Sequence, residues 1–252
     1  MISWKIFSHS LNMVLRNWRD ALRIALVPVL IGVVLFVAFL GGLMSEAMHM
    51  DANGVPTVDP ALAGPLFLAA VVFIILELWV FVNWHRFVLL EEYPQGWIPP
   101  FRGGRILAYI GVSLILALVM GLVAAVVIGM VVMMSAAVFP PVIAMILAIA
   151  AFVFVGVFLF RLLPMLPAAA IGERLSMSQS LQATRGTAGT AIMLFVVLIL
   201  VQLLLQFIVG ASMMVFAPLG FIFSLGAALV MTLVNVSILT TLYGHYVQGR
   251  PI

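Results

Sequence analysis

Charged side chains are scarce in this sequence, and cysteine is absent from it. Aspartate, glutamate, lysine and arginine make up 8% of the residues, against about 25% in a soluble domain, which excludes a water-soluble fold. The lack of cysteine excludes a disulfide scaffold and thiol chemistry. Apolar residues make up 66% of the chain, which excludes intrinsic disorder because disordered chains are poor in hydrophobic residues. The 252 residues are therefore predicted to form a multi-pass membrane protein.

The apolar residues gather in uncharged stretches long enough to cross a bilayer, which takes about 20 residues in a helix. The uncharged segment 106–160 has room for two spans, and Pro140 and Pro141 divide it because proline breaks helical hydrogen bonding. Pro218 divides the last uncharged segment in the same way. The predicted fold is an all-α polytopic bundle that forms a single integral-membrane domain over residues 1–252. Its six spans are expected at about 23–45, 64–88, 106–133, 141–163, 188–213 and 218–245.

The basic residues all fall on one side of such a six-span chain. The eleven lysine and arginine residues lie with both termini, at the span ends or in the loops of that side. Because cytoplasmic loops retain lysine and arginine, both termini are predicted to be cytoplasmic (N-in/C-in) in a plasma membrane. The lipid bilayer is the expected partner, and no basic block is dense enough to bind nucleic acid.

Residues 1–22 are predicted to form an amphipathic helix that lies in the membrane interface, because apolar side chains recur there with helical spacing. Tryptophan favours the headgroup level, so Trp4 and Trp18 are expected to contact lipid. A second interfacial helix is expected after Ser176, which forms a capping-box pattern with Gln179. The apolar face of the first helix is expected to consist of Trp4, Phe7, Leu11, Val14 and Trp18.

Trp84, His85 and Arg86 follow one another at the inner boundary of the second span. Residues of these types at a bilayer boundary ordinarily anchor the helix and contact anionic headgroups. The sequence therefore predicts that all three contact lipid.

Small side chains recur every four residues along the third span and again along the sixth. In lipid, close approach of helix backbones through small residues drives association more than apolar burial does. Both faces are expected to be buried against other helices, either within the chain or across a homo-oligomer. The first stripe consists of Ser113, Ala117, Gly121, Ala125 and Gly129, and the second of Gly220, Ser224, Ala228 and Thr232.

Glu77 is an acidic residue inside a predicted span. It lies nine residues before Arg86, about 13 Å along the helix axis and hence near the middle of a hydrocarbon core about 30 Å thick. A central acidic residue costs about 2.5–3.5 kcal/mol on insertion, so such groups face the bundle or a wet cavity. Two hypotheses stay open: a proton- or cation-coupling carboxyl of a transporter, and a neutral carboxyl hydrogen-bonded to a neighbouring helix. Candidate partners are Gln202, Gln206 and Asn235.

Methionines gather at the outer ends of the spans. Met44, Met48 and Met50 surround His49, and thioether and imidazole ligands suit Cu(I). Methionine is also a flexible filler of gaps between helices, and we favour that interpretation over a metal site.

No catalytic signature accompanies these features. The sequence contains no G-x-S-x-G, no H-E-x-x-H and no P-loop, so the protein is predicted not to be an enzyme and to need no cofactor. Glu91 and Glu92 are interpreted as the solvated, charged end of a loop.

The segment 161–186 combines an arginine-led helix end, Pro164 and Pro167, a short acidic loop at Glu173 and a serine-rich interfacial helix. Together with the amphipathic N-terminal segment and six spans, it resembles the poorly characterised bacterial inner-membrane proteins of the YciC-like type. It is also similar to the membrane domains fused to some glycerophosphodiester phosphodiesterases. The resemblance implies a bacterial inner-membrane protein without established chemistry. Phosphodiesterase activity is not implied, because no soluble catalytic domain is attached.

Two functions of different classes follow. The first is non-enzymatic: organisation of the envelope, or assembly into a homo-oligomer or a larger membrane complex. The alternative is a small ion- or proton-coupled transporter that uses Glu77. Handling of Cu(I) by the outer methionines is a further, less favoured alternative.

Overall fold

The structure is a computed structural model that describes residues 1–47, 49–50, 56–57, 60–137 and 140–252. Six helices in this part of the chain are long and apolar enough to cross a membrane. The prediction of an all-α, multi-pass membrane protein is therefore confirmed. The spanning helices are α2 (Trp18–Ala47), α3 (Ala63–Leu90), α4 (Gly103–Ala137), α5 (Pro141–Leu162), α8 (Ala188–Val215) and α9 (Ala217–Tyr246). The shorter elements are α1 (Ile2–Arg16), β1 (His49–Met50), β2 (Pro56–Thr57), η1 (Pro60–Leu62), α6 (Met165–Ile171) and α7 (Met177–Ala183).

Prolines mark the starts of two spans, as the sequence predicts. α5 begins at Pro141, where the missing N–H group costs no helical hydrogen bond. α8 ends before Phe216, whose backbone is extended (φ −155°, ψ 101°), and Pro218 lies in the first turn of α9. Pro218 thus marks the boundary between α8 and α9, as Pro141 marks the start of α5.

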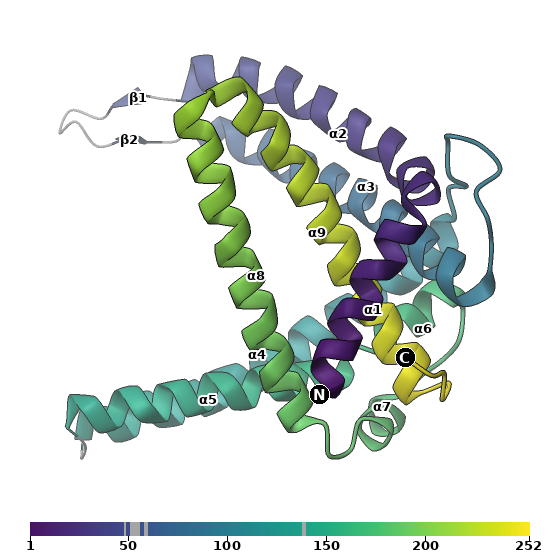
Figure 1. The fold of residues 1–252 in the computed structure, drawn as a ribbon. Helices are drawn as coiled ribbons and strands as arrows, with labels where there is room; N and C mark the ends of the chain where they lie inside the picture. The colour runs from purple at the N-terminus through teal and green to yellow at the C-terminus, as the bar shows by residue number, and fades with distance from the viewer. Residues whose placement is uncertain (48, 51–55, 58–59, 138–139) are drawn as a thin grey trace.

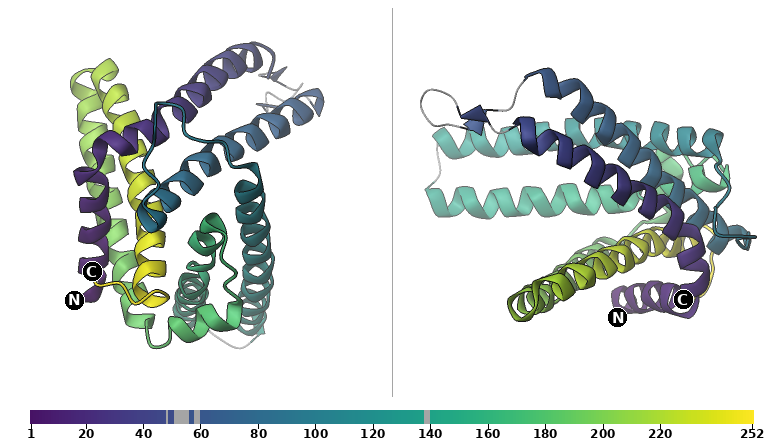
Figure 2. Two further views of the ribbon diagram at one scale, coloured as in Figure 1. Left: turned by 90° about the vertical axis from the view of Figure 1, so that its right-hand side faces the viewer. Right: turned by 90° about the horizontal axis from the view of Figure 1, so that it is seen from above.

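The spanning helices form three hairpins, α2–α3, α4–α5 and α8–α9. The hairpins lie close together at one end of the molecule, where α1, α6, α7 and both termini also lie, and diverge toward the other end (Figures 1 and 2). All eleven lysine and arginine residues belong to helix ends or connecting segments at the first end. We call it the arginine-bearing end.

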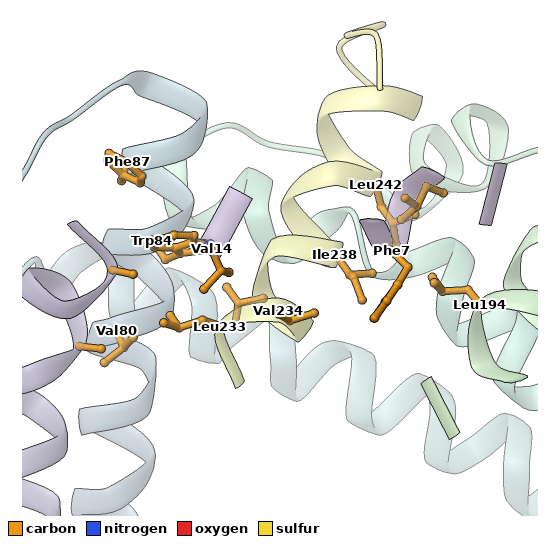
Figure 3. Close-up of a cluster of buried hydrophobic side chains, with 14 of the residues drawn as sticks. Phe7, Val14, Val80, Trp84, Phe87, Leu194, Leu233, Val234, Ile238 and Leu242 are labelled. Atoms are coloured by element: carbon orange, nitrogen blue, oxygen red, sulfur yellow. The ribbon is translucent and has the colours of Figure 1, made fainter. Parts of the chain in front are cut away.

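The main core cluster lies at the arginine-bearing end and draws on α1, α2, α3, α5, α8 and α9; Figure 3 shows part of it. Phe7 of α1 is 5% exposed and packs among side chains of α8 and α9, including Leu194 and Leu242. Trp84 of α3 is fully buried in the same cluster. Because the hairpins diverge beyond this cluster, most side chains of their outer halves are exposed.

Two predictions about the N-terminal segment are wrong in detail. The predicted interfacial helix over 1–22 breaks at Asn17, whose Nδ2 donates to the carbonyl of Met13 at 2.8 Å, and the first span begins at Trp18. The expected single apolar face is divided, since Trp4 and Trp18 are exposed whereas α1 packs against the bundle through another face. The buried residues of α1 are Ser3, Ile6, Phe7, Ser10 and Val14.

Ser10 allows α1 to pack closely against α9. Ser10 is fully buried, and its hydroxyl shares a 3.0 Å hydrogen bond with the hydroxyl of Thr241 on α9. A small side chain allows two backbones to approach, and the hydroxyl satisfies its own polarity across the interface. The buried face of α1 shares Phe7 and Val14 with the predicted apolar face, but it also includes serines that the periodicity of large apolar residues does not mark.

Candidate functional site

α2, α3 and α9 line an open groove near the middle of their lengths. The cavity has a volume of about 660 Å³. Its walls come from α2 between residues 28 and 36, from α3 between 73 and 81, and from α9 between 225 and 232. The lining side chains are apolar apart from Glu77 and Thr232, so a single ionisable group faces an apolar space.

Glu77 lies at the midpoint of α3, and its side chain is exposed at the groove. Phe73 and Phe81 lie one turn before and one turn after it, on the same helix face. Within the described residues Glu77 makes no hydrogen bond and no ion pair, although it interacts electrostatically with Tyr109 of α4. The arrangement leaves both carboxyl oxygens available to a ligand.

Aromatic and proline residues shape the walls around this carboxyl. The rings of Phe36 and Phe73 meet edge-on, with centroids 6.3 Å apart and an interplanar angle of 75°. Gly32 of α2 faces the same ring, which lies 3.6 Å from the position that a β-carbon would take. Pro28 is buried inside α2, where its ring removes one helical hydrogen bond. These residues make this part of the groove wall apolar.

The structure does not bring the predicted partners to Glu77. Gln202 and Gln206 are exposed on α8, which does not line the groove, and Asn235 is exposed on α9 beyond it. Thr232 of α9 lines the groove instead. The sequence signal for this position was the small-residue stripe of the sixth span, whose members Ala228 and Thr232 both face the cavity.

Hydrogen bonds between α3 and α9 replace the lipid contacts predicted for Trp84 and His85. Trp84 Nε1 donates to Ser237 Oγ at 2.8 Å, and His85 Nδ1 lies 2.8 Å from Thr240 Oγ1. Both α3 side chains are fully buried in protein, so the prediction that they contact lipid is wrong. The span continues past them to Leu90, which places them inside the bundle rather than at its boundary.

The His85 ring lies between two helices and keeps one nitrogen free. It stacks on Tyr109 of α4, with ring centroids 5.9 Å apart and an interplanar angle of 23°. Its Nε2 atom is buried without a hydrogen-bond partner among the described residues. Sequence analysis missed Tyr109, because nothing in an apolar span indicates which aromatic residue will face a histidine.

Arg86 and Arg102 hold Glu92 at the start of the loop after α3. Arg86 Nε donates to Glu92 Oε2 at 2.9 Å, its Nη2 donates to Oε1, and Arg102 Nη2 donates to Oε2 at 2.5 Å. The hydrogen bond from Arg86 lowers the pKa of Glu92 from its ordinary value of 4.5. The charges of both arginines act in the same direction, whereas partial burial opposes them.

Arg86 therefore serves a structural role in place of the predicted headgroup contact. Its Nη1 also donates to the carbonyls of Ala170 and Ile171, at 3.2 and 3.4 Å, at the end of α6. Cations stabilise helix C-termini, where carbonyl groups lack partners. Only Glu91 of the acidic pair matches the interpretation as a solvated end, since it is exposed and Glu92 is paired.

Within the segment 161–186, α7 is hydrogen-bonded to Arg161 at the end of α5. The Arg161 carbonyl accepts hydrogen bonds from Ser180 at 2.7 Å and from Thr184 at 3.2 Å, and Arg161 Nη2 donates to the Leu181 carbonyl at 2.6 Å. The predicted capping box is confirmed, because Ser176 and its partner three residues later bond reciprocally at the start of α7.

The two small-residue stripes behave differently. Gly220 is buried where α9 meets α8, and a β-carbon there would lie 2.6 Å from the backbone nitrogen of Met213. On α4, in contrast, Ala117, Gly121 and Ala125 are exposed. A β-carbon at Gly121 would meet no atom within 4 Å. The prediction that the α4 stripe is buried within the chain is therefore wrong for these residues, and burial across an oligomer stays a prediction. Ser113 and Gly129 of α4 and Ser224 and Thr232 of α9 are half-buried. Ala228 of α9 is exposed at the groove, so the prediction that the second stripe is buried is wrong for this residue.

The predicted methionine and histidine group cannot be compared with the structure at the level of its side chains. The positions of the Met44, Met48, His49 and Met50 side chains are not described. Among the described residues, histidine and carboxylate side chains form no cluster of three that suits a metal ion.

The fold and the groove define a multi-pass helical membrane protein with an intramembrane carboxyl exposed in an apolar cavity. Comparison of the chain with protein-family models, with characterised proteins and with solved structures finds no match.

Proposed function

We propose that this protein is a non-enzymatic membrane protein that assembles with further membrane helices, either of a second copy or of a larger complex in the envelope. The observation that carries the proposal is the uncovered small-residue face of α4, around Gly121. Helices in lipid associate where small residues let backbones approach. The arginine-bearing end is already closed by its own core, so the divergent outer halves are the surfaces free to bind a neighbour.

A matched pair of glycine substitutions tests this proposal. Gly121→Leu places a large side chain in the small-residue stripe of α4, and Gly210→Leu makes the same change at an exposed glycine of α8. At both positions the structure has no neighbouring atom within 4 Å of the new β-carbon. A photoreactive amino acid at Ala117 reports contact with a neighbour in native membranes. We expect Gly121→Leu to reduce this crosslinking at least fivefold, with Gly210→Leu and thermal stability unchanged. Equal crosslinking in both variants, or none in the parent protein, contradicts the proposal.

The membrane that we propose is the inner membrane of a bacterium, with both termini in the cytoplasm. The collection of all eleven lysine and arginine residues at one end supports this orientation, because translocated loops carry few basic residues. The resemblance of segment 161–186 to YciC-like proteins supports the bacterial assignment.

A second function has an observation of its own in its favour, the cavity that reaches Glu77. A carboxyl that a membrane cavity reaches can exchange a proton or a cation, as in an ion-coupled permease. Proton flux into pyranine-loaded proteoliposomes tests this function. A permease predicts a flux that Glu77→Gln abolishes and that the exposed-loop variant Glu91→Gln preserves. Equal flux in the parent and in Glu77→Gln excludes it.

A further inference from the structure

The groove of α2, α3 and α9 has the size and lining of a small-molecule site. Its volume of about 660 Å³ falls within the 300–1,000 Å³ that is typical of ligand pockets. Such pockets combine apolar and aromatic walls with a few polar groups that fix the ligand's orientation. Here the polar side chains are the carboxyl of Glu77 and the hydroxyl of Thr232.

The carboxyl of Glu77 lacks a cation of its own. No lysine or arginine lines the groove. The nearest lysine or arginine along α3 is Arg86, about 13 Å away along the helix axis, and its guanidinium binds Glu92 and carbonyls of α6. An isolated carboxylate at mid-membrane depth is costly, so binding of a cation beside it is favourable.

Aromatic rings reinforce this preference for positive charge. Phe73 and Phe81 flank the carboxyl on the same face of α3, and Phe36 approaches from α2. The face of an aromatic ring attracts an organic cation, most strongly where water is excluded. A negative carboxyl in a groove that three phenylalanines line thus favours an apolar cation over a hydrated inorganic one.

We propose that the groove binds an amphiphilic organic cation, with the charge beside Glu77 and the apolar body against α2 and α9. The proposal deepens the permease function and rests on the same carboxyl, but it requires binding alone. A neutral lipid chain is the competing occupant, and its binding does not depend on the charge at Glu77.

The test measures equilibrium binding of radiolabelled tetraphenylphosphonium to the full chain in nanodiscs. We expect saturable binding above that of empty nanodiscs, weakened at least tenfold in Glu77→Gln. The control Glu91→Gln makes the same substitution at an exposed carboxyl outside the groove and should bind as the parent does. Binding that is not saturable, or that is equal in Glu77→Gln and the parent, overturns the proposal.

A second pair of variants separates the groove from the carboxyl alone. Val33 lines the groove, whereas its neighbour Val34 is 65% exposed and lies outside the lining. Val33→Trp should abolish tetraphenylphosphonium binding by filling the space, while Val34→Trp should retain it. Equal binding in both variants overturns the proposal.

The binding experiment tests the proposed site, and the flux experiment tests the permease function, so one proposal can be contradicted without the other. Saturable binding without proton flux leaves this site standing and removes the permease function. Flux that depends on Glu77 without tetraphenylphosphonium binding leaves the permease and removes the present proposal.

Discussion

Buried polar residues join the helices at the arginine-bearing end. Ser237 and Thr240 accept or share hydrogen bonds with α3 and also donate to carbonyls of their own helix, at 2.7 and 2.9 Å. An unpaired polar group in an apolar medium is costly, so such groups pair with one another and fix which helix faces meet. Their placement explains why α9 is the central helix of this end.

The pairing of Glu92 with Arg86 and Arg102 should be measurable as stability. Glu92→Gln removes the charge that both arginines share, and we expect the free energy of unfolding at pH 7 to fall by about 1 kcal/mol, because Glu92 is partly solvated. Unfolding in mixed detergent micelles measures the change. Glu91→Gln, at an exposed neighbour that forms no ion pair with the residues that the structure describes, is the control and should not change stability.

The lowered pKa of Glu92 leads us to expect that the stability of the protein depends on pH. The pKa of this carboxyl is lowered in the folded protein, so its stabilising effect is complete above the ordinary value of 4.5 and is lost as the pH falls through the lower folded value. Titration from neutral to acidic pH should therefore destabilise the parent protein more than Glu92→Gln. Parallel curves for the two proteins would show that Glu92 contributes nothing.

Single residues mark the limit of what the sequence could predict. Glu77 was identified because a charge inside an apolar stretch is visible without any structure. Trp84 and His85 were assigned to lipid because the sequence placed them at the boundary of the span and did not show the direction in which they face. In a helix that is apolar on all sides, no periodicity tells the packed face from the lipid face.

At the scale of the element, Gly220 holds the α8–α9 hairpin together. Gly220→Leu places side-chain atoms against the backbone of Met213, and we expect a loss of about 1–3 kcal/mol of stability. Thermal unfolding of the detergent-purified protein measures the loss. The control is Gly210→Leu, where the structure leaves open space. Equal melting temperatures for the two variants would refute the close contact.

The packing of α1 against α9 leads to a further prediction. Ser10→Leu inserts bulk where α1 meets Thr241, and should lower stability by about 1–3 kcal/mol and expose α1 to added protease. Asn12→Leu makes a comparable change at an exposed position of the same helix and should leave both properties unchanged. Protection of α1 that persists in Ser10→Leu would contradict the packing described.

Elements were predicted better than the contacts between them. Proline positions and uncharged lengths predicted six spans, and six helices of the described residues are long and apolar enough to cross a membrane. The packing of α1 against the bundle was not predicted, because the counted residues were large and apolar, while its closest approach depends on serine.

For the whole molecule, the distribution of charge shows which helix ends lie together. Alternating helix directions bring every lysine and arginine to one end, and the structure closes that end with a core while the hairpins diverge at the other. The divergence itself was invisible in the sequence, because apolar side chains suit lipid and protein neighbours alike.

Thiol labelling from the two sides of the membrane tests the six-span arrangement most directly. The chain has no cysteine, so Asn53→Cys, Ser178→Cys and Pro251→Cys each introduce a single thiol. In sealed vesicles, a membrane-impermeant maleimide should label Ser178→Cys and Pro251→Cys from one side and Asn53→Cys from the other. Labelling of Asn53→Cys from the same side as the other two would contradict the arrangement.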